Sequence, residues 1–160
     1  MIYDNAQEFA SRIAPPAALV GLDLGTKTIG VAVADPMWMV ASPLRTIRRR
    51  KFKTDCAELM DIVDDRAAQG IVLGLPLNMD GSSGPRAQAT MAFARNLLGV
   101  RDIPVLMWDE RLSTVAAERA LLEADTSRAR RAEVIDHVAA GVILQGALDR
   151  LAHLRHEAGP

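Results

Sequence analysis

The sequence predicts a single α/β domain in which helices cover a mixed sheet. Two nearly continuous apolar runs near the start, residues 17–23 and 29–34, are typical of buried strands. Helical periodicities then alternate with further short apolar runs along the rest of the chain, as expected for an α/β domain. The 160 residues, 49% of them apolar, are enough for one substantial core and favour one domain.

The first half of the chain predicts a hairpin, a short strand and a helix. Residues 25–27 form a tight glycine-containing turn between the two apolar runs, so these runs are expected to pair as a hairpin. A weaker apolar stretch at 43–47 predicts a third, shorter strand. Apolar residues recur at helical spacing over 54–69, and Gly70 is placed to end that helix.

The second half of the chain predicts an alternation of strands and helices. Residues 71–75 form a buried strand that leads into a polar loop at 76–84. Pro85 suits the first turn of the next helix, which Ser83 can cap, and residues 103–108 predict the following strand.

Two helices complete the predicted domain. Ser113 or Thr114 caps the first, which runs to about residue 124, and the second covers about 132–154, so that 125–131 is expected to be a loop. The chain therefore divides into a leader at 1–16, a domain at 17–154 and a tail at 155–160.

The composition limits the classes of function. The formal net charge is −1 and the pI about 6.3, so any nucleic-acid binding must use local basic patches. Cys56 is the only cysteine, which excludes an internal disulfide and a cysteine-built zinc cluster and suits a reducing compartment. Residues 1–14 are too polar for a signal peptide or a membrane span, so a cytoplasmic location is expected.

Three segments carry a carboxylate where apolar neighbours predict burial. Asp23 ends an apolar strand, where it needs a metal or a hydrogen-bonding partner. Asp109 and Glu110 follow another strand, and only one of them should face a site there because adjacent strand residues point to opposite faces. Asp136 lies in a largely apolar helical segment, where it binds a ligand or caps the helix. For Asp109 and Glu110, the alternative is a solvated strand end.

These three segments supply what a divalent-cation site requires. Mg²⁺ and Mn²⁺ favour carboxylate oxygens, and a site holding two such ions can cleave phosphodiesters. His137 is more readily explained as a packed neutral histidine than as a metal ligand.

Four motifs in order carry a resemblance to a known family. They are Gly-Leu-Asp-Leu-Gly-Thr-Lys at 21–27 followed by Ile-Gly-Val-Ala at 29–32, Gly-Leu-Pro at 74–76 with Asp-Gly at 80–81, Asp-Glu-Arg-Leu-Ser-Thr at 109–114, and Ile-Asp-His-Val-Ala-Ala at 135–140. Over roughly residues 17–150 the chain resembles the bacterial family of Holliday junction resolvases or pre-16S rRNA nucleases.

The resemblance implies an RNase H-like fold with a five-stranded mixed sheet, and a metal-dependent nuclease. It also implies that Asp23, Glu110 and Asp136 are the catalytic residues and the ligands of Mg²⁺ or Mn²⁺. The chain departs from the commonest family pattern at Thr28, where many members carry arginine. One substrate contact of the family is therefore missing here or is supplied by another residue.

Basic and polar side chains in five segments are the expected nucleic-acid contacts. The densest patch lies around residues 45–53 and suits salt-sensitive phosphate binding, although a solvated strand edge would have the same composition. The predicted substrate-binding residues are Lys27, Arg48, Arg49, Arg50, Lys51, Asn78, Arg86, Arg111, Arg128, Arg130 and Arg131.

The resulting functional prediction is an endonuclease that processes the 5′ end of pre-16S rRNA. A Holliday junction DNA resolvase is one alternative, and a noncatalytic module with ribosome-assembly or transcription partners is another. A nucleotide-binding phosphotransferase is less compatible, because its ATP site lies between two lobes and this chain has room for one. The sequence identifies no dimer surface, so a monomer and a homodimer both remain open.

Overall fold

The molecule is built on one six-stranded mixed sheet. The computed structural model describes the backbone of residues 1–125 and 128–158, and their side chains except at 116, 122–123, 125, 128–134 and 158. Across the sheet the strand order is β1-β6-β5-β2-β3-β4. The strands are β1 (Ile2–Tyr3), β2 (Ala18–Leu24), β3 (Thr28–Ala34), β4 (Ala41–Arg48), β5 (Ala68–Leu75) and β6 (Val105–Asp109).

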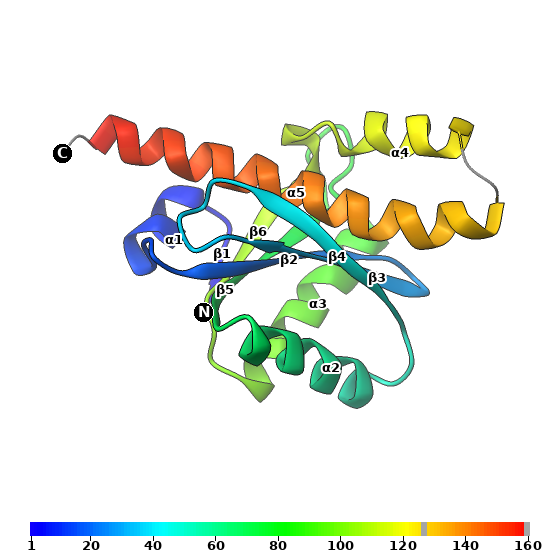
Figure 1. Ribbon diagram of the computed structural model, residues 1–160, viewed down its shortest axis with the longest axis horizontal. Coiled ribbons are helices and arrows are strands. Elements are labelled where there is room, and N and C mark those ends of the chain that lie inside the picture. Colours follow the sequence, from blue (N-terminus) through cyan, green and yellow to red (C-terminus); the bar gives the residue numbers. More distant parts are fainter. Residues whose placement is uncertain (126–127, 159–160) are drawn as a thin grey trace.

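Helices cover both faces of this sheet. They are α1 (Ala6–Arg12), α2 (Phe52–Asp65), α3 (Pro85–Val100), a 3₁₀ turn η1 (Glu110–Leu112), α4 (Val115–Asp125) and α5 (Arg128–Ala158). The long α5 crosses one face, with α4 beside it, and α2 and α3 lie on the other face (Figure 1). Two apolar clusters, one on each side of the sheet, form the core. Among the described helices, none is long and apolar enough to span a membrane.

The predicted α/β class and the mixed sheet are confirmed, but the sheet has six strands rather than five. The additional strand is β1, whose Ile2 and Tyr3 pair in parallel with Val105 and Leu106. Phe9 of α1 is fully buried and packs edge-to-face on Tyr3, with ring centroids 5.9 Å apart. The segment expected to be an appended leader is therefore packed on the sheet, because it carries two large apolar side chains that need burial.

Several predicted boundaries change. The helix predicted over 54–69 ends at Asp65, since Ala67 adopts a positive φ of 51°. Gly70 does not end it but lies within β5, where a Cβ atom would meet the side chains of Leu19 and Phe9. A strand that packs this closely excludes a bulkier residue there.

The starts of two later helices also differ from the prediction. The cap of α3 is Gly84, without a side-chain hydrogen bond, rather than Ser83. Helix α5 begins at Arg128, so much of the loop expected at 125–131 is helical. Charge patterning alone cannot separate a polar loop from the solvated first turns of a long helix.

A close approach of α5 to the hairpin formed by β2 and β3 determines where the acids lie. A Cβ atom on Gly30 of β3 would stand 1.8 Å from the backbone oxygen of Asp136 in α5. A Cβ atom on Gly21 of β2 would stand 2.7 Å from Cβ of Leu144. The two glycines therefore let the helix backbone lie directly on the sheet beside Asp23, which pairs with Gly30.

Candidate active site

Asp23 is the central acid of the candidate site. It lies near the end of β2, in the middle of the sheet, and is only 5% exposed. Both of its carboxylate oxygens accept hydrogen bonds from Nη2 of Arg119 at 2.8 Å. A buried carboxylate requires a positive partner or several donors, and here one guanidinium nitrogen supplies the positive charge.

Glu110 approaches Asp23 from the end of the neighbouring strand pair. Strands β5 and β6 pair in parallel as far as Leu75 and Asp109. Glu110 follows directly, at the start of η1. Gly74 makes room for it, because a Cβ atom there would stand 2.8 Å from Oε1 of Glu110. Burial, followed by the negative charge of Asp23, raises the pKa of Glu110 above the ordinary glutamate value.

Asp136 reaches the same region from α5. Its carboxylate accepts a short hydrogen bond from the hydroxyl of Thr28, the first residue of β3. Burial raises the pKa of Asp136, and the charge of Asp23 adds to this, whereas the hydrogen bond from Thr28 opposes it. The neighbouring His137 faces β4, with its Nδ1 atom 3.0 Å from Oγ1 of Thr46.

Arg119 of α4 is the cation nearest to these acids. Its Nη2 atom contacts Asp23 and lies 3.9 Å from Oε1 of Glu110, and its charge interacts with Asp136. Within the part of the chain that the structure describes, no three histidine, cysteine, aspartate or glutamate side chains form a ready-made metal site. Asp23 and Glu110 thus meet at the guanidinium, and Asp136 lies within range of its charge while bonded to Thr28, without the three forming a carboxylate cluster.

Arg119 was not among the residues predicted from the sequence. The available signal was its spacing, since Arg119 follows the buried Val115 by four residues and so lies on the same face of α4. An arginine on the inner face of an amphipathic helix indicates a buried partner, but the sequence does not say which one.

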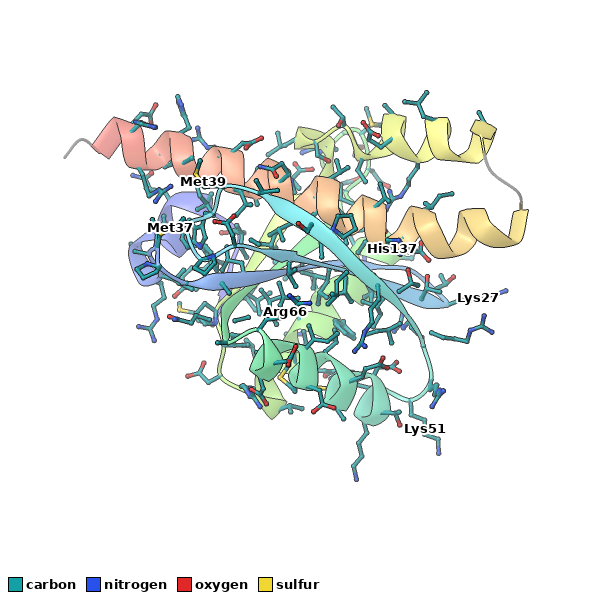
Figure 2. All side chains as sticks on the ribbon, in the orientation of Figure 1. Lys27, Met37, Met39, Lys51, Arg66 and His137 are labelled. Atoms are coloured by element: carbon teal, nitrogen blue, oxygen red, sulfur yellow. The ribbon has the colours of Figure 1, made fainter. Side chains whose placement is uncertain are left out.

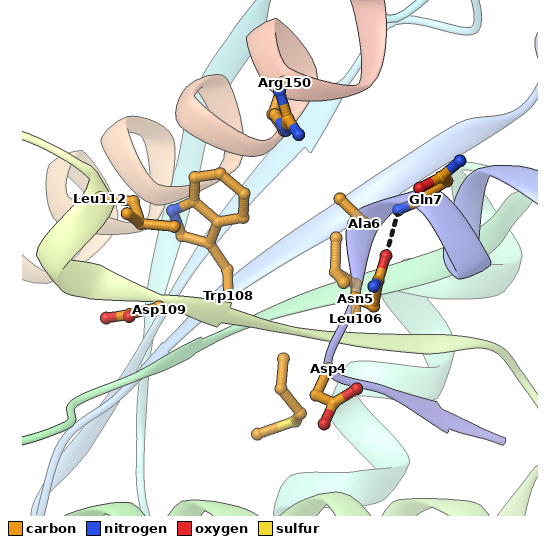
Figure 3. A pocket seen from close by; sticks show the side chains of 10 residues that line it. Asp4, Asn5, Ala6, Gln7, Leu106, Trp108, Asp109, Leu112 and Arg150 are labelled. Atoms are coloured by element: carbon orange, nitrogen blue, oxygen red, sulfur yellow. Dashed lines mark hydrogen bonds between the residues drawn. The ribbon is translucent and has the colours of Figure 1, made fainter. Parts of the chain in front are cut away.

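Asp109 has a different environment from Glu110. Its carboxylate accepts hydrogen bonds from the guanidinium and the backbone N–H of Arg111, and these lower its pKa. Asp109 borders a separate hollow of about 280 Å³ that also involves Trp108 and Arg150 (Figure 3). Of the two adjacent acids, Glu110 is therefore the one near Asp23.

Basic side chains surround a hollow beside Asp136. The hollow measures about 690 Å³, and Lys27, Arg48 and Arg49 line it together with Thr28 and Asp136. Lys27 projects from the tip of the hairpin (Figure 2). The Arg49 guanidinium also donates a hydrogen bond to the carbonyl of Gly25 at 2.6 Å. Among the described residues, Lys27 and Arg48 have no side-chain hydrogen bond or ion pair with another part of the chain, whereas Arg49 also holds the turn.

The remaining predicted contacts divide into exposed residues and residues with internal partners. Arg50 and Lys51 are exposed before α2. Asn78 donates to Ser82 within the loop before α3, Arg111 pairs with Asp109, and Arg86 lies 3.4 Å from the carbonyl of Leu24. The side chains of three further predicted contacts lie outside the described residues: Arg128, Arg130 and Arg131.

Comparison with known proteins assigns the chain to a family. The family model RuvX, described as Holliday junction resolvase, matches residues 17–150. The chain belongs to this family. Relatives named "Putative pre-16S rRNA nuclease" include one from Cereibacter sphaeroides strain KD131, 65% identical over 99% of both chains. Another, from Rhodobacter capsulatus, is 66% identical over 96% of this chain and 97% of its own length.

Solved structures show that this RuvX family member has a resolvase-like fold. Thermus thermophilus RuvC in complex with a Holliday junction substrate aligns with a TM-score of 0.53, at 12% identity, over 86% of this chain and 96% of its own. The yeast mitochondrial Holliday junction resolvase Ydc2 aligns with a TM-score of 0.51, at 13% identity, over 94% of this chain and 86% of its own. The predicted RNase H-like class is in line with these neighbours.

Proposed function

We propose that this protein is a divalent-metal-dependent endonuclease that processes the 5′ end of pre-16S rRNA. One observation carries the proposal: Asp23 and Glu110, from separate segments of the chain, share one guanidinium at the end of the central strands, and Asp136 of α5 lies near enough for its charge to act on the same site. The choice of pre-16S rRNA as the substrate rests on the names of relatives that are about 65% identical.

The chemistry of the three acids fits Mg²⁺ or Mn²⁺, which favour carboxylate oxygens. A cation held there would activate a water molecule and stabilise the leaving oxygen of the phosphodiester. For the acids to gather, Arg119 must leave Asp23 and the carboxylate of Asp136 must turn from Thr28. Both are side-chain movements about backbones that Gly30 and Gly74 already hold close together.

The hollow beside Asp136 is the proposed path of the nucleic-acid backbone. Lys27, Arg48 and Arg49 line it and suit contacts with phosphates, which are independent of sequence and weaken with salt. The acids alone would repel a phosphate, so cleavage requires a cation. Recognition of the precursor as RNA would come from contacts beyond these phosphates.

Cleavage of a pre-16S rRNA carrying its 5′ extension tests the proposal. We expect cleavage with Mn²⁺ or Mg²⁺, none with a chelator, and a loss of about 100-fold or more in Asp23→Asn, since several kcal/mol of transition-state stabilisation are removed. Asp61→Asn, at an exposed position of α2, is the matched control and should cleave normally. Chelator-resistant cleavage, or full activity of Asp23→Asn, would refute the mechanism.

Resolution of four-way DNA junctions is the second candidate, favoured by the description of the matching family. Symmetric cutting of a junction requires two active sites, and hence a dimer. Measuring both substrates side by side, with the oligomeric state in solution, separates the two: a monomer that cuts the RNA precursor and leaves the junction intact supports rRNA processing.

A further inference from the structure

Arg119 contacts the Asp23 carboxylate in the way that a bound cation would. A single nitrogen, Nη2, stands 2.8 Å from both oxygens of the Asp23 carboxylate. The same nitrogen lies 3.9 Å from Oε1 of Glu110. The Arg119 side chain is 26% exposed and that of Asp23 is 6% exposed, so solvent screens this contact only weakly.

A divalent cation would need the same carboxylate oxygens. Mg²⁺ binds carboxylates at about 2.0–2.1 Å and accepts little departure from its preferred geometry. The guanidinium nitrogen already fills the space in front of both Asp23 oxygens, and it carries a charge of the same sign as the metal. Occupation by Arg119 and occupation by a divalent cation therefore exclude each other in this position.

We propose that Arg119 is a built-in counterion that occupies the cation position of the metal-free protein, so that a divalent ion binds only by displacing it. The inference rests on the proposed metal site and adds a residue that controls its affinity. The observed affinity then equals the intrinsic affinity multiplied by the fraction of molecules in which Arg119 has left the acids.

The position of Arg119 makes this displacement feasible. It lies on α4, which packs mainly against α5 on the outside of the molecule (Figure 1). Release of the guanidinium therefore requires rotation of one long side chain, or a movement of α4, and leaves the core strands in place. Asp23 itself stays fixed by its pairing with Gly30.

Direct binding of Mn²⁺, followed by calorimetry, tests the proposal without reference to cleavage. Arg119→Met removes the competing charge and replaces the aliphatic part of the arginine with an apolar side chain. We expect this variant to bind Mn²⁺ about tenfold more tightly than the wild type. Arg119→Lys keeps the charge on a single ammonium, and its affinity should lie between the two. Arg101→Met is the matched control, because Arg101 pairs with Asp64 on α2 and should leave Mn²⁺ affinity unchanged.

The results distinguish this inference from the proposed function. Equal or weaker Mn²⁺ binding by Arg119→Met, with the wild type binding normally, overturns the role of Arg119 alone. Absence of Mn²⁺ binding in every variant overturns the metal site as well. If Arg119→Met folds only with Mn²⁺, its recovery by the ion supports the proposal. If it does not fold at all, Arg119→Lys decides, since equal or weaker binding by that variant refutes it.

Discussion

Replacing Gly30 by alanine tests the close approach of α5 to the sheet, on which the candidate site depends. The added Cβ atom would stand 1.8 Å from the backbone oxygen of Asp136 and 2.3 Å from its carbonyl carbon. Real Cβ atoms essentially never come within 3.0 Å of such atoms, so the separation must open by moving α5 or β3. No flexible side chain can absorb this movement, because the obstructing atoms are backbone.

The cost follows from the packing around this contact. The residues of α5 that follow Asp136 include the fully buried Ala140, Ile143 and Leu144, so lifting the helix disturbs one of the two apolar clusters. Over-packing of a core costs about 1–3 kcal/mol, and a backbone clash belongs at the upper end, so we expect a loss of about 3 kcal/mol. For a chain of this size the melting temperature should fall by about 6–12 °C.

Equilibrium unfolding in urea, followed by circular dichroism, measures this loss. Gly99→Ala is the matched control, since Gly99 lies in α3 and a Cβ atom there has no neighbour within 4 Å. Alanine is favoured over glycine in a helix, so this control should gain about 0.5–1 kcal/mol. If Gly30→Ala unfolds within about 0.5 kcal/mol of the wild type, the close approach inferred here is wrong.

Three further predictions concern the acids, the first residues and the hollow beside Asp136. Because burial and then the charge of Asp23 raise the pKa of Glu110, the folded metal-free chain binds a proton there at higher pH than the unfolded chain does. The contribution of Glu110 to the free energy of unfolding should therefore rise as the pH falls from neutral toward the ordinary glutamate pKa of about 4.3, and Glu110→Gln should remove this contribution from the pH dependence. Phe9→Ala should cost about 3–5 kcal/mol in urea unfolding, since Phe9 is fully buried. Combined Lys27→Ala and Arg48→Ala should weaken RNA binding, and lower the slope of log affinity against log salt by about 0.7 per lost contact.

Each of these predictions has a control and a contrary result. Asp61→Asn should keep the pH dependence of the wild type, and an unchanged slope in Glu110→Gln would contradict the pKa argument. Loss of less than about 1 kcal/mol in Phe9→Ala would mean that the first residues contribute little to the core. Arg12→Ala should bind RNA as the wild type does, because Arg12 ends α1, and α1 lies at the opposite end of the sheet from Lys27 (Figures 1 and 2).

Much of the fold could be predicted because local sequence determines it. The apolar runs that became β2 and β3, and the glycine-containing turn between them, needed no information from distant residues. Errors arose where a distant partner decides. Ile2 became a strand residue only because β6 offers an unpaired edge, and Gly70 is in a strand because Phe9 and Leu19 fill the space above it.

The sequence by itself determined that carboxylates stand among or beside apolar neighbours, where burial demands a partner: Asp23, Asp136 and one of the adjacent Asp109 and Glu110. The tertiary structure alone decided that partner. Arg119 lies 96 residues from Asp23 along the chain, and its role depends on how α4 packs on α5. Spacing along one element reveals which side chains share a face, but a pair between elements depends on the packing of the whole sheet.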